Sequence, residues 1–571
     1  MQTKTLFFTA PDWQGKRSAL LDIFMGGVAV LGFAPFHIFP LTLLSFAYLF
    51  LRLQNAAALK RAGRAGFNIG LRVGFGFFLF GMYWIGSAFL ARGAEFILLM
   101  PPMILGLVLL LSLFWGIAGG LFARLSRSIL YGPSLSGPHF SPQGHKPQGG
   151  RLIISAILFI NLFFLAEYAR GHLFGGLPWN LPGYIFKAGG AISQSASIVG
   201  IYGLNLIVMI LSVCLAISIM KWMEKPLNAL FPGLLGMGIF LSLFVFGHHR
   251  ISQADVQFVP DVNLRIVQVD FLQKDQFDPN RAFDITNEFI RTSYGEGLEG
   301  VSHIIWPEGA VSGLLLENPN LINAMGATLT RSDGTAPYWL FNSLRREQKI
   351  NGNGGVNGGS NGEVLFYNSS VAMGFDKGSP RVVGYEDKVR LVPFGEFIPF
   401  ERVLKSIVPQ SLSTSIASMT PGGHKKILDL PGLPPVSAQI CYEGIFSGLT
   451  PIGGEGASPS WILNQSNDAW YGRSIGPYQH ANQVSYRAIE QGLPIIRATV
   501  NGISGSIDAY GRYVSKLQKS QTQYADVKLP RQTAKPLFSQ LIYKFMLLLN
   551  VIGFILCLVM NIYIKCSIQK Q

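Results

Sequence analysis

Long apolar runs dominate this chain of 571 residues and restrict what it can fold into. Only 13% of the residues are charged, whereas soluble domains carry roughly 25%. A run of about 20 apolar residues is long enough to cross a bilayer. Candidate runs lie at 19–34, 36–51, 67–90, 97–123, 152–170, 196–220, 227–247 and 541–564. The pattern predicts a polytopic α-helical membrane bundle with about eight spans, of which the first two are short and interrupted by Gly and Pro.

The basic residues follow the apolar runs in an alternating pattern. The formal net charge is +15, and the loops 52–66, 124–151 and 221–226 hold more Lys and Arg than the loops between them. This alternation fits the positive-inside rule with both termini in the cytoplasm. The polar block after the seventh run then lies outside the cytoplasm. Because membrane topology accounts for most of the basicity, we expect a lipid bilayer as partner and no nucleic acid.

The chain divides into three parts by composition. Residues 1–250 form the bundle of about seven spans, 251–535 form a polar domain, and 536–571 form a C-terminal transmembrane anchor. In the polar part, strand patterns at 264–269, 303–306, 364–375, 436–441, 461–464 and 494–500 alternate with helix patterns at 281–294 and 478–491. This mixture predicts a two-layered or sandwiched α/β domain. The Asn/Gly-rich insert 351–362 is typical of a flexible loop.

Cysteine usage narrows the possible chemistry of the polar domain. Four cysteines occur, and only Cys441 lies in the polar block. One thiol cannot form a disulfide framework or a Cys-rich zinc site. No His-x-x-x-His pair or acidic cluster indicates a metal, so we expect neither a metal nor another cofactor. A lone thiol is a candidate nucleophile, although an inert buried cysteine is the commoner case.

Glu308 and Lys388 are the groups that would allow Cys441 to act as a nucleophile. Each of the three residues ends an apolar, strand-like run, and loops at strand ends commonly carry functional groups. A thiol with an ordinary pKa of about 8.5 needs a proton acceptor at pH 7. Glu308 would accept that proton in the apolar surroundings of Trp306 and Pro307. The Lys388 ammonium would lower the thiol pKa and donate a hydrogen bond to an oxyanion.

Three neighbouring residues are candidate supporting groups. The backbone N–H of Tyr442 is a second donor for the oxyanion. Glu396, eight residues after Lys388, would orient Lys388 or relay protons, and Glu443 would act in the same way. Ordinary alternatives stay open, because a Glu after Trp-Pro is usually a turn carboxylate and a Lys before an apolar run is usually a solvated strand end.

Other residues allow more than one interpretation. His480 could pair with Cys441, but its position at the start of a helix favours a capping or surface role. Glu167 and Arg170 share one face of the fifth run, where an ion pair is either functional or structural. Two Gly-x-x-x-Gly pairs indicate helix packing: Gly70/Gly74 and Gly116/Gly120.

The motifs that carry these residues resemble known families. The segments "IIWPEGA", "YEDKVRLVPFGEFIP" and "QICYEGIF" resemble the Glu-Lys-Cys motifs of the nitrilase superfamily, and more closely those of the apolipoprotein N-acyltransferase family. The match extends to "LNQSNDAWYGRSIGPYQH", "YRAIEQGLPIIRATVNGISGSID", "GFAPFHIFPLTLLSF" and "LAEYARGHLFGGLPWNLPGY". The resemblance therefore covers nearly the whole chain, in order.

The resemblance implies a fold, a reaction and a location. It implies an αββα nitrilase-like domain that faces the periplasm from a multi-pass protein of the inner membrane. The implied reaction takes an acyl chain from a glycerophospholipid, typically phosphatidylethanolamine, through a Cys441 thioester in a ping-pong mechanism. The chain then passes to the N-terminal amine of the S-diacylglyceryl cysteine of an apolipoprotein, the final step of lipoprotein maturation. The implied partners are the phospholipid donor and the diacylated apolipoprotein acceptor.

The resemblance also implies roles for single residues. Glu308 would be the general base and then the general acid, and Lys388 the oxyanion donor. Glu396 matches the family's supporting carboxylate, Tyr442 and Glu443 match the residues after its nucleophile, and Asn368 matches a position near the site. Two departures are visible in this chain. Phe277 stands where Trp is usual, which keeps an aromatic face and loses an indole N–H, and Gly309 replaces a small hydroxyl residue.

Competing functions would use parts of the same sequence. A membrane-tethered nitrilase-type amidase or hydrolase would use the same triad, with water as the second acceptor. A non-catalytic membrane scaffold would not require the triad. A transporter would be expected to show polar residues in several spans and an internal repeat, and the sequence shows neither beyond Glu167.

Overall fold

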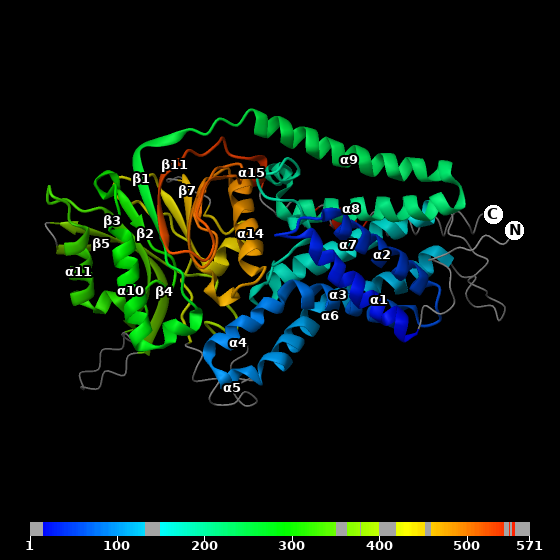
Figure 1. Cartoon of the computed structure of the whole chain (residues 1–571). Coiled ribbons are helices and arrows are strands. Elements are labelled where there is room, and N and C mark those ends of the chain that lie inside the picture. The colour runs from blue at the N-terminus through cyan, green and yellow to red at the C-terminus, as the bar shows by residue number, and fades with distance from the viewer. Residues whose placement is uncertain are drawn as a thin grey trace, which may run out of the picture. The chain divides into compact units, whose positions relative to one another are not determined.

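The computed structural model describes residues 15–131, 149–349, 363–376, 379–398, 418–451 and 458–541, with 548, 551–553 and 555. The chain forms two compact units (Figure 1). One comprises Met1–Gly86, Glu95–Gln253 and Leu537–Gln571, and the other Ser87–Ala94 and Ala254–Pro536. The insert at 351–362 and most of the predicted eighth span lie outside the described residues.

The first unit is helical. The α-helices up to residue 252 are α1 (Lys16–Ala29), α2 (Phe39–Ala57), α3 (Ala62–Met82), α4 (Gly86–Arg92), α5 (Ala94–Ile97), α6 (Met100–Tyr131), α7 (Gly149–His172), α8 (Ala196–Glu224) and α9 (Pro226–Ser252). Of these, α4 belongs largely to the second unit. A short helix, α15 (Leu537–Leu541), returns to the first unit at the end of the chain.

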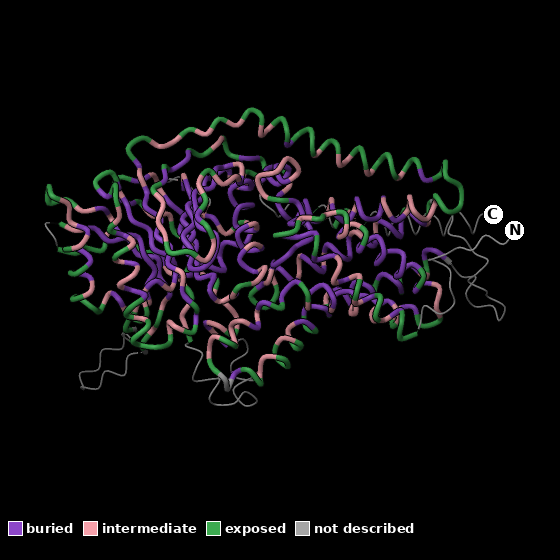
Figure 2. The backbone as a smooth tube through the Cα atoms, in the orientation of Figure 1, coloured by how far each residue is buried: buried purple, intermediate pink, exposed green. Residues whose placement is uncertain are grey.

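Five of the eight predicted membrane spans are candidate spans among the residues that the structure describes. Among the described residues, 5 helical stretches are long and apolar enough to cross a membrane: Ala62–Arg92, Met100–Leu130, Gly150–Gly175, Ile192–Glu224 and Pro226–Ser252. They correspond to the third to seventh predicted runs. The last of them, α9, is mostly exposed along its length (Figure 2). Exposed apolar side chains on such a helix are suited to contact with lipid.

The helix formed by the first predicted run carries a buried charge. α1 has 14 residues and buries the carboxylate of Asp22. That carboxylate accepts hydrogen bonds from Arg52 at 3.0 Å and from the Tyr48 hydroxyl at 2.8 Å, both on α2. A buried carboxylate is tolerated only with such partners. The first two runs therefore form a pair of helices joined by an internal ion pair, and neither is among the candidate spans.

Glycines allow α3 and α6 to pack closely, as the Gly-x-x-x-Gly pairs predicted. A Cβ atom added at Gly70 would lie 2.1 Å from the carbonyl oxygen of Trp115, and one at Gly66 would lie 2.3 Å from that of Gly119. Small residues at such positions let two helix backbones approach each other. The glycine pairs are therefore packing features.

We expect Gly70→Ala to destabilise the helical unit. The added methyl group would overlap the Trp115 carbonyl, and overpacking of this kind costs typically about 1–3 kcal/mol. The matched control is Gly106→Ala in α6, where an added Cβ meets nothing within 4 Å. Thermal unfolding of the full chain in detergent should show a lower melting temperature for Gly70→Ala only. Equal melting temperatures for the two variants would contradict the close approach of α3 and α6.

The second unit contains two β-sheets. Its strands are β1 (Phe258–Gln268), β2 (His303–Ile305), β3 (Tyr338–Lys349), β4 (Glu363–Asp376), β5 (Ser379–Asp387), β6 (Val436–Ile440), β7 (Trp461–Asn467), β8 (Ile495–Val500), β9 (Gly505–Ile507), β10 (Tyr513–Lys516) and β11 (Gln523–Pro530). The 6-stranded sheet has the order β11-β1-β2-β3-β4-β5, and the 5-stranded sheet has the order β10-β9-β8-β7-β6. Its longer helices are α10 (Pro279–Ser293), α11 (Pro319–Leu329) and α14 (Gly476–Gln491).

Three clusters of buried side chains place these elements in four layers. One cluster joins β1, β3 and β11 to β7 and β8 and fills the space between the two sheets. A second packs α10 and α11 on the outer face of the 6-stranded sheet. A third packs α14 on the outer face of the 5-stranded sheet. The layer order is helix, sheet, sheet, helix, and the buried segments gather in the sheets (Figure 2).

The strands predicted from the sequence are present as β1, β2, β4, β6, β7 and β8, and the two predicted helices are α10 and α14. The sequence did not indicate β3, β5, β9, β10 or β11. The second half of β3 is polar, with the sequence RREQK, and β5 is an edge strand whose residues are mostly exposed. Only the first four residues of β3, YWLF, form an apolar run, and β5 has no such run.

Candidate active site

Cys441 lies directly after β6, at a sharp turn. Its φ is 49°, in the left-handed region that non-glycine residues rarely adopt. Glu443 holds this turn, because its Oε2 accepts a hydrogen bond from the backbone N–H of Ile440 at 2.8 Å. Only 6% of Cys441 is exposed. A strained backbone that its surroundings hold in place is typical of functional sites.

Glu308 follows β2 and faces Cys441. Its Oε1 accepts hydrogen bonds from Asn368 Nδ2 at 2.9 Å and from Lys388 Nζ at 3.2 Å. Its Oε2 accepts one from the backbone N–H of Asn467 at 3.0 Å. It also shares a hydrogen bond with the Cys441 thiol. The carboxylate is therefore held by polar groups, and the predicted apolar pocket is wrong.

The expected source of that pocket, Trp306, lies elsewhere. Its indole N–H donates to the Ser293 hydroxyl at 2.8 Å, and its ring packs against Trp339 in the cluster under α10 and α11. Trp306 thus packs into the cluster between the 6-stranded sheet and the helices α10 and α11. It supports the end of β2 and does not surround the carboxylate.

Lys388 follows β5 and lies between two carboxylates. Its Nζ is 3.2 Å from Glu308 Oε1 and 2.9 Å from Glu396 Oε1. Only 1% of Lys388 is exposed. Asn368 donates from Nδ2 to both carboxylates, at 2.9 Å in each case. The structure therefore brings together Glu308, Lys388, Cys441, Glu396 and Asn368.

The surroundings fix the protonation states of the three central groups. Burial alone would raise the pKa of Glu308, but the Lys388 ammonium and hydrogen bonds from its neighbours hold this pKa below the usual range. Burial alone would lower the pKa of Lys388, but Glu308 and Glu396 raise it well above its ordinary value. Burial first, and then Glu308, raise the pKa of the Cys441 thiol, and Lys388 only partly opposes them. Lys388 thus lowers the thiol pKa, as expected, but burial and Glu308 outweigh it, and the resting site holds a neutral thiol, a carboxylate and an ammonium.

Glu443 supports the site through the backbone. Its Oε1 accepts from the N–H groups of Val389 at 2.7 Å and Arg390 at 3.1 Å, the two residues after Lys388. Its Oε2 accepts from Ile440 and lies 2.6 Å from Lys425 Nζ. One buried carboxylate therefore joins the turn at Cys441 to the segment after Lys388. The partners of Lys388 Nζ among the described residues are Glu308 and Glu396, so Glu443 does not orient that ammonium directly.

The remaining predicted residues lie at the edge of the site. The ring of Tyr442 is buried and packs edge-on against Phe446, with centroids 5.0 Å apart. Phe277 is 55% exposed and contacts Trp470 with centroids 5.9 Å apart. Its neighbour Gln276 donates a hydrogen bond to the Gly309 carbonyl, next to Glu308. The departure at Phe277 therefore concerns the rim of the site and not its charged centre.

His480 is neither a cap nor a surface residue, contrary to the sequence-based expectation. It lies in α14, is fully buried, and its Nδ1 is 2.9 Å from Asp468 Oδ1. Burial lowers the pKa of His480, although Asp468 opposes this. The ring also interacts with the backbone of Cys441. It pairs with a carboxylate and not with the thiol.

The sequence did not indicate several residues that hold the site. Asn467 binds Glu308 through its backbone N–H and receives support from Gln273, whose Oε1 accepts from Asn467 Nδ2 at 2.8 Å. Asn342 donates to Asn368 Oδ1 at 2.6 Å. The polar residues that follow Leu463 were a signal for such supporting groups, because they continue an apolar strand. The structure shows that every residue of this strand, β7, is buried. Buried polar side chains in a strand need partners.

In the helical unit, Glu167 and Arg170 form a structural ion pair. Arg170 contacts both carboxylate oxygens of Glu167 and donates to the backbone carbonyls of Leu177 and Trp179. Trp115 Nε1 donates to Glu167 Oε1 at 2.7 Å. Both charged side chains are fully buried and well supplied with partners. The pair therefore links the segment after α7, through the Leu177 and Trp179 carbonyls, to Trp115 on α6.

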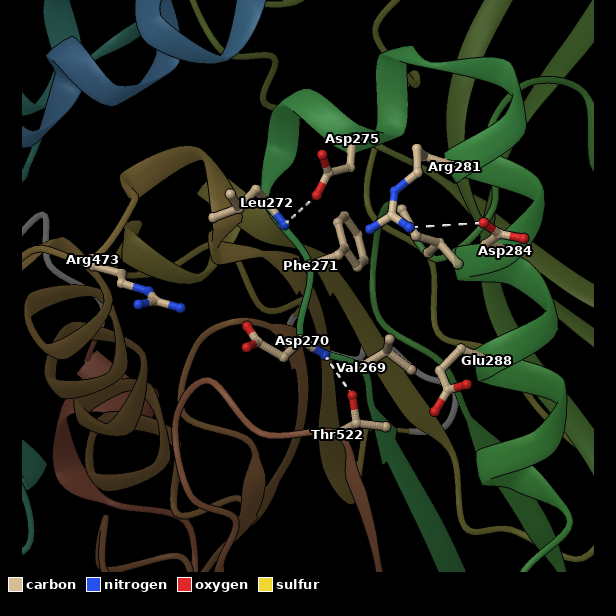
Figure 3. Close-up of a pocket in the computed structure, with 11 residues that line it drawn as sticks. Val269, Asp270, Phe271, Leu272, Asp275, Arg281, Asp284, Glu288, Arg473 and Thr522 are labelled. Carbon is tan, nitrogen blue, oxygen red and sulfur yellow. Dashed lines mark hydrogen bonds and ion pairs between the residues drawn. The ribbon is translucent and has the colours of Figure 1, made fainter.

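A groove of about 400 Å³ lies in the second unit, outside the group of residues just described (Figure 3). It is lined by Val269, Asp270, Phe271, Leu272, Asp275, Arg281, Asp284, Ile285, Glu288, Arg473 and Thr522. None of the site residues predicted from the sequence lines it. Within the described part of the chain, no group of three or more His, Cys, Asp or Glu side chains could hold a metal ion.

Comparison with known proteins accounts for both units. Residues 25–214 match the model of the apolipoprotein N-acyltransferase N-terminal domain, and residues 265–537 match that of carbon-nitrogen hydrolase. The apolipoprotein N-acyltransferase of Rhodopseudomonas palustris is 31% identical over 535 residues, covering 92% of each chain. The chain belongs to the apolipoprotein N-acyltransferase family. The resemblance predicted from its motifs is confirmed.

Other relatives agree with this placement. The apolipoprotein N-acyltransferase of Brucella melitensis is 32% identical over 528 residues, covering 90% of each chain. That of Caulobacter vibrioides is also 32% identical over 528 residues, covering 92% of this chain and 90% of its own. A solved amidase from Nesterenkonia sp. AN1, with acrylamide on its active-site cysteine, matches 47% of this chain and 93% of its own, with 15% identity and a TM-score of 0.28. A TM-score this low does not establish a common fold by itself.

Glu386 gives the site a pH-dependent stability. Burial raises its pKa to about 7, and Lys425 and Lys426 only partly oppose this. The folded protein therefore keeps this carboxyl protonated up to about pH 7, whereas the unfolded chain ionises it near its ordinary pKa of 4.5. The stabilisation is present at low pH and is lost as the pH rises through 7.

We expect Glu386→Gln, which mimics the protonated acid, to gain stability relative to the wild type as the pH rises. Between pH 5 and pH 8 the difference in the free energy of unfolding should change by up to about 3 kcal/mol. Melting temperatures of both proteins at several pH values would measure it. A matched control is Glu347→Gln on β3, whose carboxylate is largely exposed. A constant difference between Glu386→Gln and the wild type would contradict the raised pKa.

Proposed function

We propose that this chain transfers an acyl chain from a glycerophospholipid, typically phosphatidylethanolamine, to the N-terminal amine of the S-diacylglyceryl cysteine of an apolipoprotein. The reaction proceeds by a ping-pong mechanism through a thioester on Cys441 and completes lipoprotein maturation. Membership in the family supports the reaction. The observation that carries the proposal is the buried contact of Glu308 with both Lys388 and the Cys441 thiol.

In the first half-reaction, Cys441 attacks the carbonyl carbon of a phospholipid acyl ester. Its thiol proton moves to Glu308 as the S–C bond forms, because this carboxylate is ionised at rest and shares a hydrogen bond with the thiol. The carbonyl oxygen becomes an oxyanion that accepts hydrogen bonds from Lys388 Nζ and the Tyr442 backbone N–H. When the C–O bond breaks, Glu308 returns the proton to the leaving alkoxide, and the lysophospholipid departs.

In the second half-reaction, the amine of the diacylated lipoprotein attacks the thioester carbonyl. Glu308 takes a proton from the amine, Lys388 again stabilises the oxyanion, and the C–S bond breaks. The Cys441 thiolate then recovers a proton from Glu308. Each half-reaction starts and ends with the same protonation states, so one site serves two substrates in turn.

The membrane helices support a transferase over a hydrolase. Both substrates are lipid-anchored, so a site held by membrane helices raises their effective concentration without added affinity. We place the protein in the inner membrane, with the second unit on the periplasmic side and both termini in the cytoplasm, because of the charge alternation in the loops. The alternative is a membrane-tethered amidase or hydrolase, in which water discharges the thioester.

We expect purified wild-type protein incubated with phosphatidylethanolamine, without an amine acceptor, to gain the mass of one acyl chain. The adduct should be labile to hydroxylamine, because thioesters are, and should be absent in Cys441→Ala. Intact-protein mass spectrometry measures both. The matched control is Cys214→Ala, since Cys214 is also a free buried cysteine but lies on α8.

Added diacylated lipopeptide should then discharge the adduct and give a triacylated product. Discharge by water at the same rate without lipopeptide would favour the hydrolase. Acyl transfer by Cys441→Ala at the wild-type rate would show that Cys441 is not the nucleophile.

We expect Lys388→Met combined with Glu396→Gln to keep the fold and lose acylation. The pair of changes removes one positive and one negative charge, so the net charge of the cluster is unchanged, and Glu308 keeps its hydrogen bonds from Asn368 and the Asn467 backbone N–H. Loss of an oxyanion donor costs about 10²–10³-fold in rate, and the rate of Cys441 acylation measures it. Glu396→Gln alone is the control and should lose much less. A loss of less than about tenfold in the double variant would make Lys388 a structural cation.

A further inference from the structure

A second cluster of buried polar groups contacts Cys441, separate from the Glu308 carboxylate. Its centre is Asp468, which is fully buried. Asp468 Oδ1 accepts from the Ser466 hydroxyl at 2.7 Å and lies 2.9 Å from His480 Nδ1. Its Oδ2 accepts from Arg497 at 2.7 Å. This cluster takes no part in the mechanism described above.

Ser466 links the cluster to the sulfur atom. It lies in β7, the strand that pairs with β6, and is fully buried. Its hydroxyl is 3.5 Å from Cys441 Sγ, within reach of a hydrogen bond to sulfur, and 2.7 Å from Asp468 Oδ1. A serine hydroxyl carries one proton and can donate to only one acceptor at a time. At rest the charged carboxylate is the better acceptor.

The balance changes when Cys441 loses its proton. A thiolate carries a full negative charge, and a donor beside it then gains a charge-assisted hydrogen bond. Asp468 can release Ser466 because Arg497 and His480 stay in contact with it. Arg497 and His480 also hold the pKa of Asp468 at about 2, against the effect of burial. Asp468 therefore stays a carboxylate throughout and does not compete with Glu308 for the proton.

We infer that Ser466 is a catalytic residue that changes its hydrogen-bond acceptor during the reaction. It donates to Asp468 at rest and rotates to donate to Cys441 Sγ as the thiol proton moves to Glu308. No covalent bond of Ser466 changes, and its proton stays on its own oxygen. The same donor assists again when the C–S bond of the thioester breaks and negative charge returns to sulfur. This inference rests on the proposed function, in which Cys441 is the nucleophile.

The test measures the reactivity of Cys441 in Ser466→Ala. The full-length protein in detergent is treated with iodoacetamide at several pH values, and modification of the peptide that contains Cys441 is followed by mass spectrometry. Loss of a hydrogen bond to a charged sulfur should slow alkylation about tenfold and move its pH dependence upward by about one unit. The rate of acylation by phosphatidylethanolamine should fall by a similar factor, with an unchanged KM.

Two further variants separate hydrogen bonding from packing. Ser437→Ala removes a fully buried hydroxyl on β6 for which the described residues supply no hydrogen-bond partner, so it should alkylate at the wild-type rate. Ser466→Thr keeps the hydroxyl and should stay within about threefold of the wild type. A wild-type alkylation rate and pH dependence in Ser466→Ala would overturn the inference. Equal slowing in Ser466→Ala and Ser466→Thr would also overturn it, because packing would then explain both.

The alkylation assay contains no phospholipid. It therefore reports on Ser466 and the sulfur even if Cys441→Ala keeps its acyl-transfer activity and the proposed function fails. In contrast, normal alkylation of Ser466→Ala together with an inactive Cys441→Ala would overturn this inference alone.

Discussion

The buried ammonium of Lys388 is the constraint on which the rest of the site depends. An ion this deeply buried is tolerated only if opposite charges and hydrogen bonds replace its water. Glu308 and Glu396 supply two negative charges at 3.2 and 2.9 Å. Two carboxylates for one cation leave an excess of negative charge, which neutral donors must stabilise. Asn368 donates to both carboxylates, and the backbone N–H of Val392 donates to Glu396 Oε2 at 2.8 Å.

The same electrostatic requirement organises the backbone around the site. Segments that follow strands have N–H groups without sheet partners, and buried N–H groups need acceptors. Glu443 supplies acceptors for N–H groups on both sides of the site, at Val389 and Ile440. Its own charge is balanced by Lys425, which also donates to the Ala438 carbonyl at 2.9 Å. The geometry between thiol and ammonium is thus set by a buried carboxylate that touches neither group.

The sequence predicted the central residues of the site better than their surroundings. Glu308 and Cys441 could be found because each follows a short strand that carries apolar residues such as Ile304 and Ile440, and such runs are visible in a sequence. Asn467 binds Glu308 through its backbone N–H. Every residue except proline has this group, so the sequence could not single out Asn467 as a partner. The expected lowering of the thiol pKa by Lys388 is present, but the sequence could not show that burial and Glu308 outweigh it. In the bundle, the pairing of Asp22 with Arg52 depends on tertiary contact, so hydropathy alone could not show that the first two runs form an ion-paired pair of helices.

A neutral thiol at rest has a consequence for how such an enzyme would work. The thiolate is the form of cysteine that reacts with oxidants and with unintended electrophiles. Burial and Glu308 keep the Cys441 pKa raised, so the thiolate is scarce until a carbonyl group is in place to accept the electron pair. Deprotonation and attack then become one event, which requires a carboxylate that is already ionised beside the sulfur. The lowered pKa of Glu308 meets that requirement, and in the proposed mechanism the ammonium that lowers it also receives the oxyanion. In the proposed mechanism, Lys388 therefore keeps Glu308 ionised and also stabilises the oxyanion that forms when Glu308 accepts the thiol proton.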